Sequence, residues 1–317
     1  MLKGEKIFIT GGAGFIGKHL IKRYYKDNEI TVYSRDEAKH YFIKKQFPKV
    51  KCIIGNVQNY ERLHKASAGH TIGIFAASLK QIEAVDQNIE EAIDTIIIGA
   101  VNSRRVALEH NMKAATFISS DKSRAATTLY GAMKFVGGEL FIINAEREKT
   151  LLSSVIYGNV FNSTGSVIPL IWDSIENNYQ LKLYGADMTR FMIEGEDAVD
   201  CIEYALQRTG VSVVPALKAM KISDLFEIYA EKFGLKFDIG APRISEKAHE
   251  ILIAHAEADR TTHDTPANIY SIHYKDISGD VTLPPTGLSS DLFTMSKKEL
   301  NELLNRNDYF RGSKFWW

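Results

Sequence analysis

The stretch KIFITGGAGFIG, residues 6–17, decides the fold of this chain. Its first part is rich in apolar and β-branched residues and predicts a strand, and residues 17–25 have the apolar spacing of a helix. Between them, Gly11, Gly14 and Gly17 follow a GxxGxxG spacing. Glycine permits a tight turn, a close approach of the backbone to a pyrophosphate and close packing of a helix on a strand. The stretch therefore predicts a dinucleotide-binding loop, with the pyrophosphate at the N-terminus of the helix.

Short β-branched segments alternate with longer amphipathic segments through the first half of the chain. The predicted strands are residues 6–10, 30–33, 51–54, 72–75 and 115–119. Strands that alternate with helices imply right-handed crossovers and a parallel sheet covered on both faces. We therefore predict an α/β fold: a doubly wound parallel Rossmann sheet with a smaller α+β C-terminal substrate domain.

The pattern also suggests where the two domains divide. We predict that residues 1–160 form the dinucleotide-binding domain, together with a returning segment at about 190–210. Residues 161–317 are predicted to form mainly the substrate-binding domain. The longest helical pattern in the first domain covers residues 88–110.

The composition excludes several classes of protein. Of 317 residues, 45% are hydrophobic and 25% are charged, as in an ordinary globular protein. Lys and Arg total 39, as do Asp and Glu, so the basic excess of a nucleic-acid binder is missing. Cys52 and Cys201 cannot form a disulfide framework and indicate a reducing compartment. No apolar stretch approaches the ~18 residues of a membrane span, and no secretory signal is seen. We expect a cytoplasmic protein with neither a nucleic-acid nor a membrane partner.

Metal binding is not expected from the histidines. His249 precedes His255 by six positions rather than the four of HExxH, so the two imidazoles do not share a helical face. The terminal FWW, residues 315–317, is either an interface anchor or a tail packed on its own surface.

The end of the second predicted strand decides between NAD and NADP. An acidic residue there binds the ribose 2′-hydroxyl, whereas an arginine suits a 2′-phosphate. Ser34, Arg35 and Lys39 can hold a phosphate by charge-assisted hydrogen bonds. Asp36 is a complication, and the alternative role for it is to cap the next helix. We predict NADP as the cofactor.

Polar residues follow the strand predicted at residues 115–119. Asp121 and Lys122 come directly after it, and Tyr130 and Lys134 lie in a segment that predicts a helix. Tyr130 and Lys134 are four positions apart and share one helical face. A nearby ammonium favours phenolate and lowers the pKa of tyrosine, so the pair can remove a hydroxyl proton while hydride leaves the same carbon. The alternative for Asp121 and Lys122 is a surface turn after the strand.

The glycine loop and the Tyr130–Lys134 pair resemble the extended short-chain dehydrogenase/reductases. Further segments narrow the resemblance: 34–37 (SRDE), 76–81 (AASLKQ), 120–122 (SDK), 157–160 (YGNV), 165–169 (GSVIP), 188–191 (MTRF) and 245–247 (SEK). Together they resemble the soluble UDP-N-acetylglucosamine 4,6-dehydratases of the polysaccharide-biosynthesis family, over roughly residues 6–255.

This resemblance implies a set of binding residues. For the cofactor they are Gly11, Ala13, Gly14, Phe15, Ile16, Gly17, Ser34, Arg35, Asp36, Lys39, Asn56, Val57, Ala76, Ala77, Tyr130, Lys134, Tyr157 and Val160. For a UDP-sugar they are Lys80, Ser120, Asn159, Val167, Arg190, Arg243 and Glu246. Among the latter, Arg190 and Arg243 suit a diphosphate. Members of the family are often homo-oligomers, and we expect the same here.

The resemblance also implies a redox-neutral elimination. Tyr130 would deprotonate O4 of the sugar as C4 passes hydride to NADP+, and the resulting ketone would acidify C5. Lys122, held neutral, would remove the C5 proton. Asp121, held protonated, would supply a proton to the departing C6 hydroxyl. Both protonation states require pKa shifts caused by burial and neighbouring groups.

Three alternatives remain open at this stage. A nucleotide-sugar 4-epimerase also uses a Tyr–Lys pair, but it has no role for Asp121 and Lys122. A 5,6-dehydratase, which would yield an exocyclic enol ether, is also compatible with the sequence. An NADP-sensing regulator without catalysis has the same fold but usually lacks the pair formed by Tyr130 and Lys134.

Overall fold

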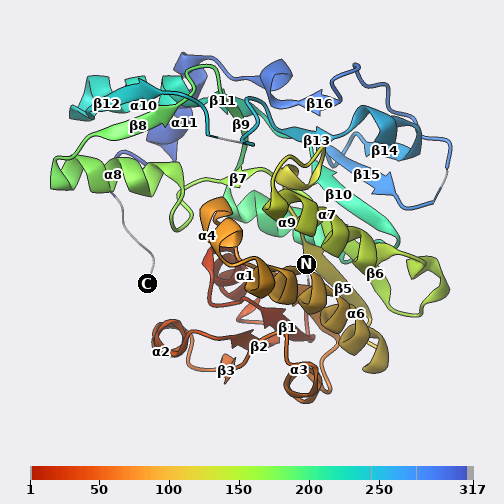
Figure 1. Ribbon diagram of the computed structural model, residues 1–317. Coiled ribbons are helices and arrows are strands. Elements are labelled where there is room, and N and C mark those ends of the chain that lie inside the picture. Colours follow the sequence, from red (N-terminus) through yellow and green to blue (C-terminus); the bar gives the residue numbers. More distant parts are fainter. Residues whose placement is uncertain (1, 244, 276, 313–317) are drawn as a thin grey trace.

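A nine-stranded sheet forms the centre of the computed structural model, which describes residues 2–243, 245–275 and 277–312 (Figure 1). The strand order is β14-β15-β10-β6-β5-β4-β1-β2-β3. The strands from β3 to β10 pair in parallel, and β15 and β14 pair antiparallel at the edge. Their bounds are β1 Lys6–Thr10, β2 Glu29–Ser34, β3 Lys51–Ile54, β4 Ile72–Phe75, β5 Ala114–Ile118, β6 Leu151–Val155, β10 Val211–Pro215, β14 Thr261–Asp264 and β15 Ile269–His273. The predicted α/β class is confirmed.

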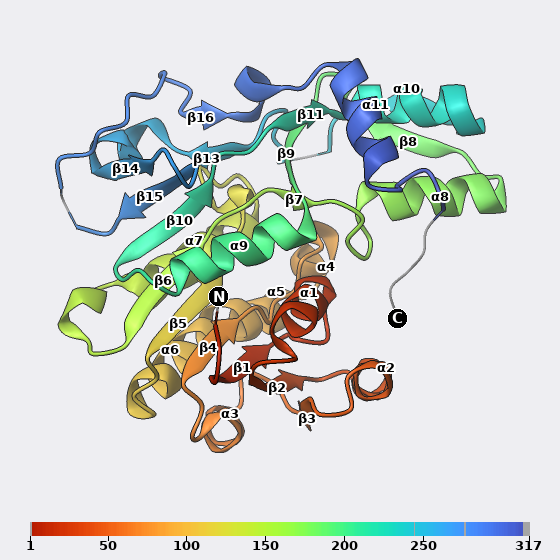
Figure 2. The same cartoon turned by 180° about the vertical axis from the view of Figure 1, so that it is seen from behind.

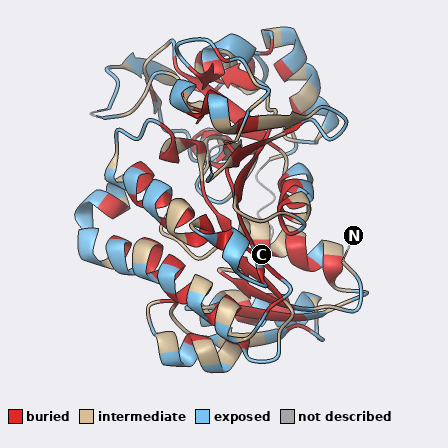
Figure 3. Cartoon of the chain, turned by 90° about the vertical axis from the view of Figure 1, so that its right-hand side faces the viewer, coloured by how far each residue is buried: buried red, intermediate tan, exposed pale blue. Residues whose placement is uncertain are grey.

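Helices cover both faces of this sheet (Figures 1 and 2). One apolar core lies between the sheet and α1, α2 and α9, and a second lies between the sheet and α3, α6 and α7. The buried strands between exposed outer helix faces are seen in Figure 3. The helix bounds are α1 Phe15–Tyr24, α2 Glu37–Gln46, α3 Tyr60–Ser67, α4 Ile82–Gln87, α5 Ile89–Ala92, α6 Gly99–Glu109, α7 Leu129–Ile142 and α9 Gly195–Ala205.

The predicted long helix at residues 88–110 is interrupted. A π-helical turn, η1 (Ile93–Ile98), joins α5 to α6. The described residues also form four short 3₁₀ helices: η2 Asp121–Ser123, η3 Ala145–Arg147, η4 His255–Arg260 and η5 Ser290–Phe293.

A second layer of small sheets and helices lies beside the large sheet (Figure 2). Its apolar core includes Trp172, Phe226, Tyr229 and Leu300. The strands are β7 Asn159–Val160, β8 Leu181–Tyr184, β9 Thr189–Ile193, β11 Ala219–Lys221, β12 Phe237–Gly240, β13 Ile251–Ile253 and β16 Leu288–Ser289. The helices are α8 Val167–Asn177, α10 Ile222–Phe233 and α11 Lys297–Arg306.

The large sheet takes strands from both halves of the chain. Besides α9, which lies in the returning segment expected at about 190–210, the later strands β10, β15 and β14 also join it. An open sheet edge accepts an antiparallel strand from distant sequence, which the local pattern does not reveal. The division into domains at residue 160 stays a prediction. Over the described ranges, none of the helices is both long and apolar enough to cross a bilayer.

Candidate active site

The glycine loop brings the backbone of three elements into close contact. Gly11 has a φ of +66°, and a Cβ atom there would lie 2.8 Å from the Ala77 backbone nitrogen. A Cβ atom at Gly17 would lie 2.1 Å from the Gly12 carbonyl oxygen, so α1 can pack on the loop only with glycine there. Gly14 caps α1 without a side-chain hydrogen bond. The first N–H groups of α1 are therefore left for an anion, as a pyrophosphate requires.

A pocket of about 920 Å³ opens beside this loop. It is lined by the predicted residues Gly11, Ala13, Gly14, Ser34, Arg35, Asp36, Lys39, Asn56, Val57 and Ala77. Sequence reasoning missed Tyr33, Gly55, Ser78 and Thr95, which also line it. Gly55 and Ser78 each adjoin a predicted residue, whereas Thr95 comes from η1 and has no local signal. The chemistry of this set fits a dinucleotide: backbone N–H groups on one side and basic side chains on the other.

The end of β2 carries the charges of this pocket. Arg35 forms an ion pair with Glu91 of α5, with 2.5 Å between Nη1 and Oε1. Asp36 caps α2 by accepting a hydrogen bond from the Lys39 backbone N–H, and its carboxylate also pairs with Lys39 Nζ at 2.8 Å. The Asp36 carboxylate is thus engaged by its own helix, as in the alternative given above. Ser34 Oγ lies 2.7 Å from His40 Nε2.

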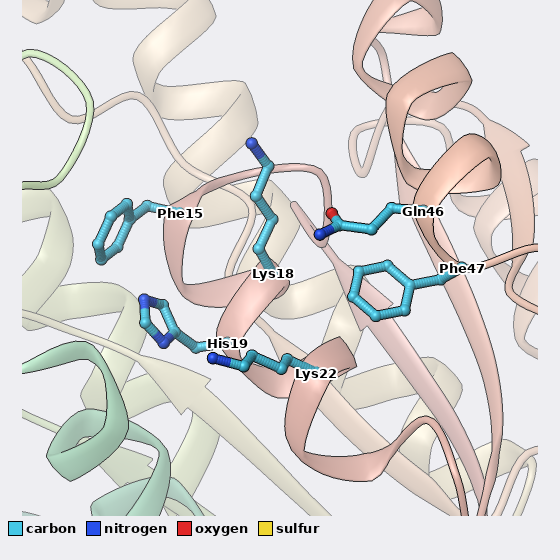
Figure 4. Close-up of a pocket in the computed structure, with 6 residues that line it drawn as sticks. All are labelled: Phe15, Lys18, His19, Lys22, Gln46 and Phe47. Atoms are coloured by element: carbon cyan, nitrogen blue, oxygen red, sulfur yellow. The ribbon is translucent and has the colours of Figure 1, made fainter. Parts of the chain in front are cut away.

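Other predicted cofactor residues lie outside the lining of this pocket: Phe15, Ile16, Gly17, Ala76, Tyr130, Lys134, Tyr157 and Val160. Phe15 instead lines a second cavity of about 420 Å³ on the outer side of α1, opposite Phe47 (Figure 4). Lys18, His19, Lys22 and Gln46 complete that lining.

Asp121 is buried in η2, at the carboxyl end of β5, and the Lys122 side chain is only 19% exposed, so the two residues do not form a surface turn. Lys122 Nζ lies 3.3 Å from Asp121 Oδ1, 3.3 Å from Asn159 Oδ1 and 3.3 Å from Glu250 Oε1. The Ser120 hydroxyl donates to Asp121 Oδ1 at 2.9 Å. Asp121 Oδ2 is buried without a hydrogen-bond partner among the described residues.

The surroundings raise the pKa of both Asp121 and Lys122. Burial raises the pKa of the Asp121 carboxyl, Lys122 opposes this, and Glu250 adds to it. Burial favours neutral Lys122, but Asp121 and Glu250 outweigh it and raise the pKa of the amine. The protonated Asp121 expected from the sequence agrees with this direction. The neutral Lys122 expected from the sequence does not agree with the raised pKa. The sequence did not reveal that a second carboxylate, that of Glu250, lies beside the amine.

Tyr130 and Lys134 lie in the first turns of α7, which begins after the cap Thr128. A Cβ atom at Gly131 would lie 2.2 Å from the Lys122 carbonyl oxygen, so this glycine lets α7 start directly against η2. Tyr130 is thereby held beside Lys122, which tends to lower the pKa of the phenol.

The expected effect of Lys134 on Tyr130 is not seen. Burial raises the pKa of Tyr130 to about 12. Burial lowers the pKa of Lys134 to about 7, and its Nζ donates to the Ile118 carbonyl at 2.8 Å. The two side chains share a helical face, but the amine is directed to the end of β5. Lys122 is the cation that acts on the phenol in this structure.

The predicted substrate residues fall into two groups. Ser120 and Asn159 contact the Asp121–Lys122 pair. The others pair among themselves or with neighbours. Arg190 is buried and binds Glu246 at 2.8 Å. Arg243 lies over the Tyr184 ring at 4.2 Å and pairs with Glu83 at 2.6 Å.

Lys80 and Val167 belong to segments of the chain other than the one that carries the Asp121–Lys122 pair. Lys80 donates to the Thr164 carbonyl, and burial lowers its pKa. Val167 is the first residue of α8. Sequence reasoning also missed Lys247, whose Nζ lies 3.1 Å from Glu250 Oε2 and donates to the Arg124 carbonyl at 2.7 Å.

A family model, curated relatives and a solved structure each match most of this chain. A family model described as polysaccharide biosynthesis protein matches residues 7–272. A UDP-N-acetylglucosamine 4,6-dehydratase (inverting) of Campylobacter jejuni is 33% identical, over 98% of this chain and 100% of that protein. A UDP-glucose 4-epimerase of Rickettsia massiliae is 31% identical over 98% of both chains. The X-ray structure of Pen from Bacillus thuringiensis superposes with a TM-score of 0.86 at 25% identity, over 97% of this chain and 99% of that one.

Proposed function

The chain belongs to the family of polysaccharide biosynthesis proteins, and from this premise we propose that it is a nucleotide-sugar 4,6-dehydratase acting on UDP-N-acetylglucosamine. One observation carries the choice of reaction. A buried carboxyl, that of Asp121, and a largely buried amine, that of Lys122, lie 3.3 Å apart beside Tyr130. An elimination needs an acid and a base in addition to the group that deprotonates the hydroxyl.

A nicotinamide dinucleotide held in the pocket beside Gly11, Gly14 and Arg35 would supply the redox chemistry, namely acceptance of hydride from C4 and its return to C6. Tyr130 reacts as the phenolate and takes the O4 proton as the C4 ketone forms. The ketone acidifies C5, and Lys122 accepts the proton from that carbon. The electron pair of the broken C5–H bond forms the C5–C6 double bond as the C6–O bond breaks. Asp121 gives its proton to the leaving hydroxide, which departs as water.

A 4-epimerase is the competing function, since relatives bear that name. Epimerisation removes and returns hydride at C4 and breaks no C5–H or C6–O bond. It has no use for a second acid and base, whereas this chain buries them at the carboxyl end of β5.

The test is to incubate the protein with UDP-N-acetylglucosamine in deuterated water and analyse the products by mass spectrometry and NMR. The 4,6-dehydratase yields a sugar that has lost water, carries deuterium at C5 and has a methyl group at C6. An exocyclic enol ether indicates 5,6-elimination. A product that differs from the substrate only in C4 configuration overturns the proposal in favour of the epimerase.

We further propose NADP as the dinucleotide. Arg35 and Lys39 provide two cations at the pocket rim, and the Asp36 carboxylate is already paired with Lys39. We expect Arg35→Asp to weaken NADP binding by about ten- to a hundredfold, as for ~1.5–3 kcal/mol of charged hydrogen bonding, with little change for NAD. Arg105→Asp is the matched control, because this exposed arginine pairs with Glu109 on α6. Equal wild-type affinity for the two dinucleotides contradicts the proposal. The names of the relatives support a UDP-sugar as the substrate, whereas a homo-oligomer and a cytoplasmic location remain predictions from the sequence.

A further inference from the structure

Resting on the proposed elimination, we infer that Glu250 is a positioning residue for Lys122. The Glu250 carboxylate holds the Lys122 amine beside Asp121 and is the counter-ion of the ammonium that C5 deprotonation creates. The sequence pattern around Glu250 gave no indication of this role.

Lys122 Nζ donates hydrogen bonds to Asp121 and Asn159 and forms an ion pair with Glu250. Oxygen atoms of Asp121, Asn159 and Glu250 each lie 3.3 Å from Nζ, and an ammonium has three N–H groups. Asp121 is 0% exposed and Glu250 is 2% exposed. A charge at such depth is costly unless it is paired, so the three ionisable groups form one unit.

The backbone of Glu250 is fixed from another part of the chain. Its N–H donates to Ser290 Oγ at 2.9 Å, and the Ser290 N–H donates to its carbonyl at 2.9 Å. Ser290 Oγ also lies 2.6 Å from Thr189 Oγ1. β13, which starts at Ile251, pairs with β16 immediately before Ser290. Glu250 is therefore placed by two elements and does not depend on a mobile loop.

The proton balance shows what this placement does. Transfer of one proton from the Nζ ammonium to the Asp121 carboxylate, 3.3 Å away, gives the neutral amine and the protonated carboxyl that the step needs. When Lys122 then takes the C5 proton, the C5–H bond breaks, an N–H bond forms and the amine becomes an ammonium again. Asp121 has by then given its proton to the leaving hydroxide and is a carboxylate, so both groups return to their charged forms. C5 is reprotonated from solvent, to which Tyr130 releases the O4 proton. Glu250 stays ionised throughout and stabilises the ammonium during the step.

Glu250 acts on both partners by charge. Burial is the largest influence on the pKa of Asp121 and raises it, and Glu250 raises it further. For Lys122, burial lowers the pKa, and Asp121 and then Glu250 reverse this. The charged groups that face Glu250 from its surroundings are Lys122 of η2, Lys247 of its own segment and Arg190 of β9, with Asp121 and Tyr130 beyond Lys122. Removing the Glu250 charge should therefore lower both pKa values.

The test is Glu250→Gln in the full chain, which keeps the shape and removes the charge. We expect a dehydration rate about ten- to a hundredfold lower at neutral pH, and both limbs of the pH–rate profile moved to lower pH by about one unit or more. Reduction of the bound nicotinamide on adding substrate should keep its wild-type rate, because that step uses Tyr130. Glu250→Asp, whose charge lies farther from Nζ, should show a smaller displacement in the same direction. This variant also serves if Glu250→Gln does not fold.

Glu257→Gln is the matched control. Glu257 is also buried, and its partners are Arg124 and Arg260. Both limbs of its profile should stay at the wild-type pH. Equal loss of rate at every pH in Glu250→Gln, with unmoved limbs, means a merely structural role and overturns the inference. If the wild type gives only a C4 epimer, the proposed function fails with it, whereas a dehydrating wild type with unmoved variant limbs sinks the inference alone.

Discussion

The two buried lysines of the site show opposite behaviour. Lys134, in α7, is 3% exposed, and burial lowers its pKa to about 7. Its contacts are neutral: the Ile118 carbonyl and the face of the Phe117 ring, 4.9 Å from Nζ. Lys122 is largely buried, with 19% of its side chain exposed, but two carboxylates raise its pKa. Burial alone therefore does not set the protonation of a lysine; the charge of its neighbours decides the sign.

This difference gives the two lysines different chemistry. A neutral amine at Lys134 can donate its hydrogen bond to the Ile118 carbonyl without adding a positive charge. A charged amine at Lys122 must lose a proton before it can act at C5. The contrast can be tested one residue at a time.

The largest effect is expected for Tyr130→Phe, which removes the phenol hydroxyl on α7, the helix that also carries Lys134. Loss of the proton acceptor at O4 should reduce turnover about a hundred- to ten-thousandfold. Reduction of bound nicotinamide should fall equally, while cofactor affinity is kept. Measuring nicotinamide absorbance after substrate addition checks this, and a near-normal rate would mean that another base operates.

The next largest effect separates oxidation at C4 from the later elimination of water. Lys122→Met should reduce dehydration by a similar hundred- to ten-thousandfold factor but slow reduction of the bound nicotinamide much less, because in that step Lys122 only lowers the pKa of the Tyr130 phenol. Stopped-flow absorbance and product analysis on the same sample distinguish the steps. Loss of both steps together would show that Lys122 also serves C4 oxidation and would remove the contrast.

The pH dependence of the free energy of unfolding tests the lowered pKa of Lys134. Because Lys134 has a pKa of about 7 when folded and an ordinary pKa near 10.5 when unfolded, the unfolded chain binds more protons between these values. The free energy of unfolding should therefore rise with pH from about 7 to about 10.5, by at most about 1.4 kcal/mol per pH unit from this group. Lys134→Met should flatten that slope in urea unfolding at several pH values. Identical slopes in variant and wild type contradict the lowered pKa.

The smallest effect is expected for Asn159→Ala. It removes a neutral partner 3.3 Å from Lys122 Nζ, in contrast to the charged partner Glu250. We expect a loss of dehydration rate of about tenfold or less, as for ~1 kcal/mol. The pH of both limbs should not change, because no charge is removed. Displaced limbs here would show that geometry, and not charge, controls the amine.

Local signals predicted much of the fold and of the site. Glycines at fixed spacing identified the loop after β1, and a four-residue spacing placed Tyr130 and Lys134 on one face of α7. Such features depend on residues near one another in sequence. They predicted Asp121 at the end of β5 for the same reason.

Long-range contacts could not be predicted in this way. Glu250 reaches Lys122 because Ser290 and Thr189 hold its backbone, and none of these contacts has a sequence period. The protonation of Lys122 was wrongly predicted as a consequence. The attachment of β15, and with it β14, to the large sheet was missed for the same physical reason, since β10, the partner of β15, lies far away in the chain.

The tie between Glu250 and Ser290 also sets an order of assembly during synthesis. Chains emerge N-terminus first, and N-terminal units generally fold first. The parallel strands β1 to β6 and the glycine loop are complete once residue 155 has emerged. Lys122 meets the fixed Glu250 carboxylate only after residue 290 has emerged. A ribosome-bound chain that ends between these points should therefore hold a dinucleotide before it can dehydrate a sugar.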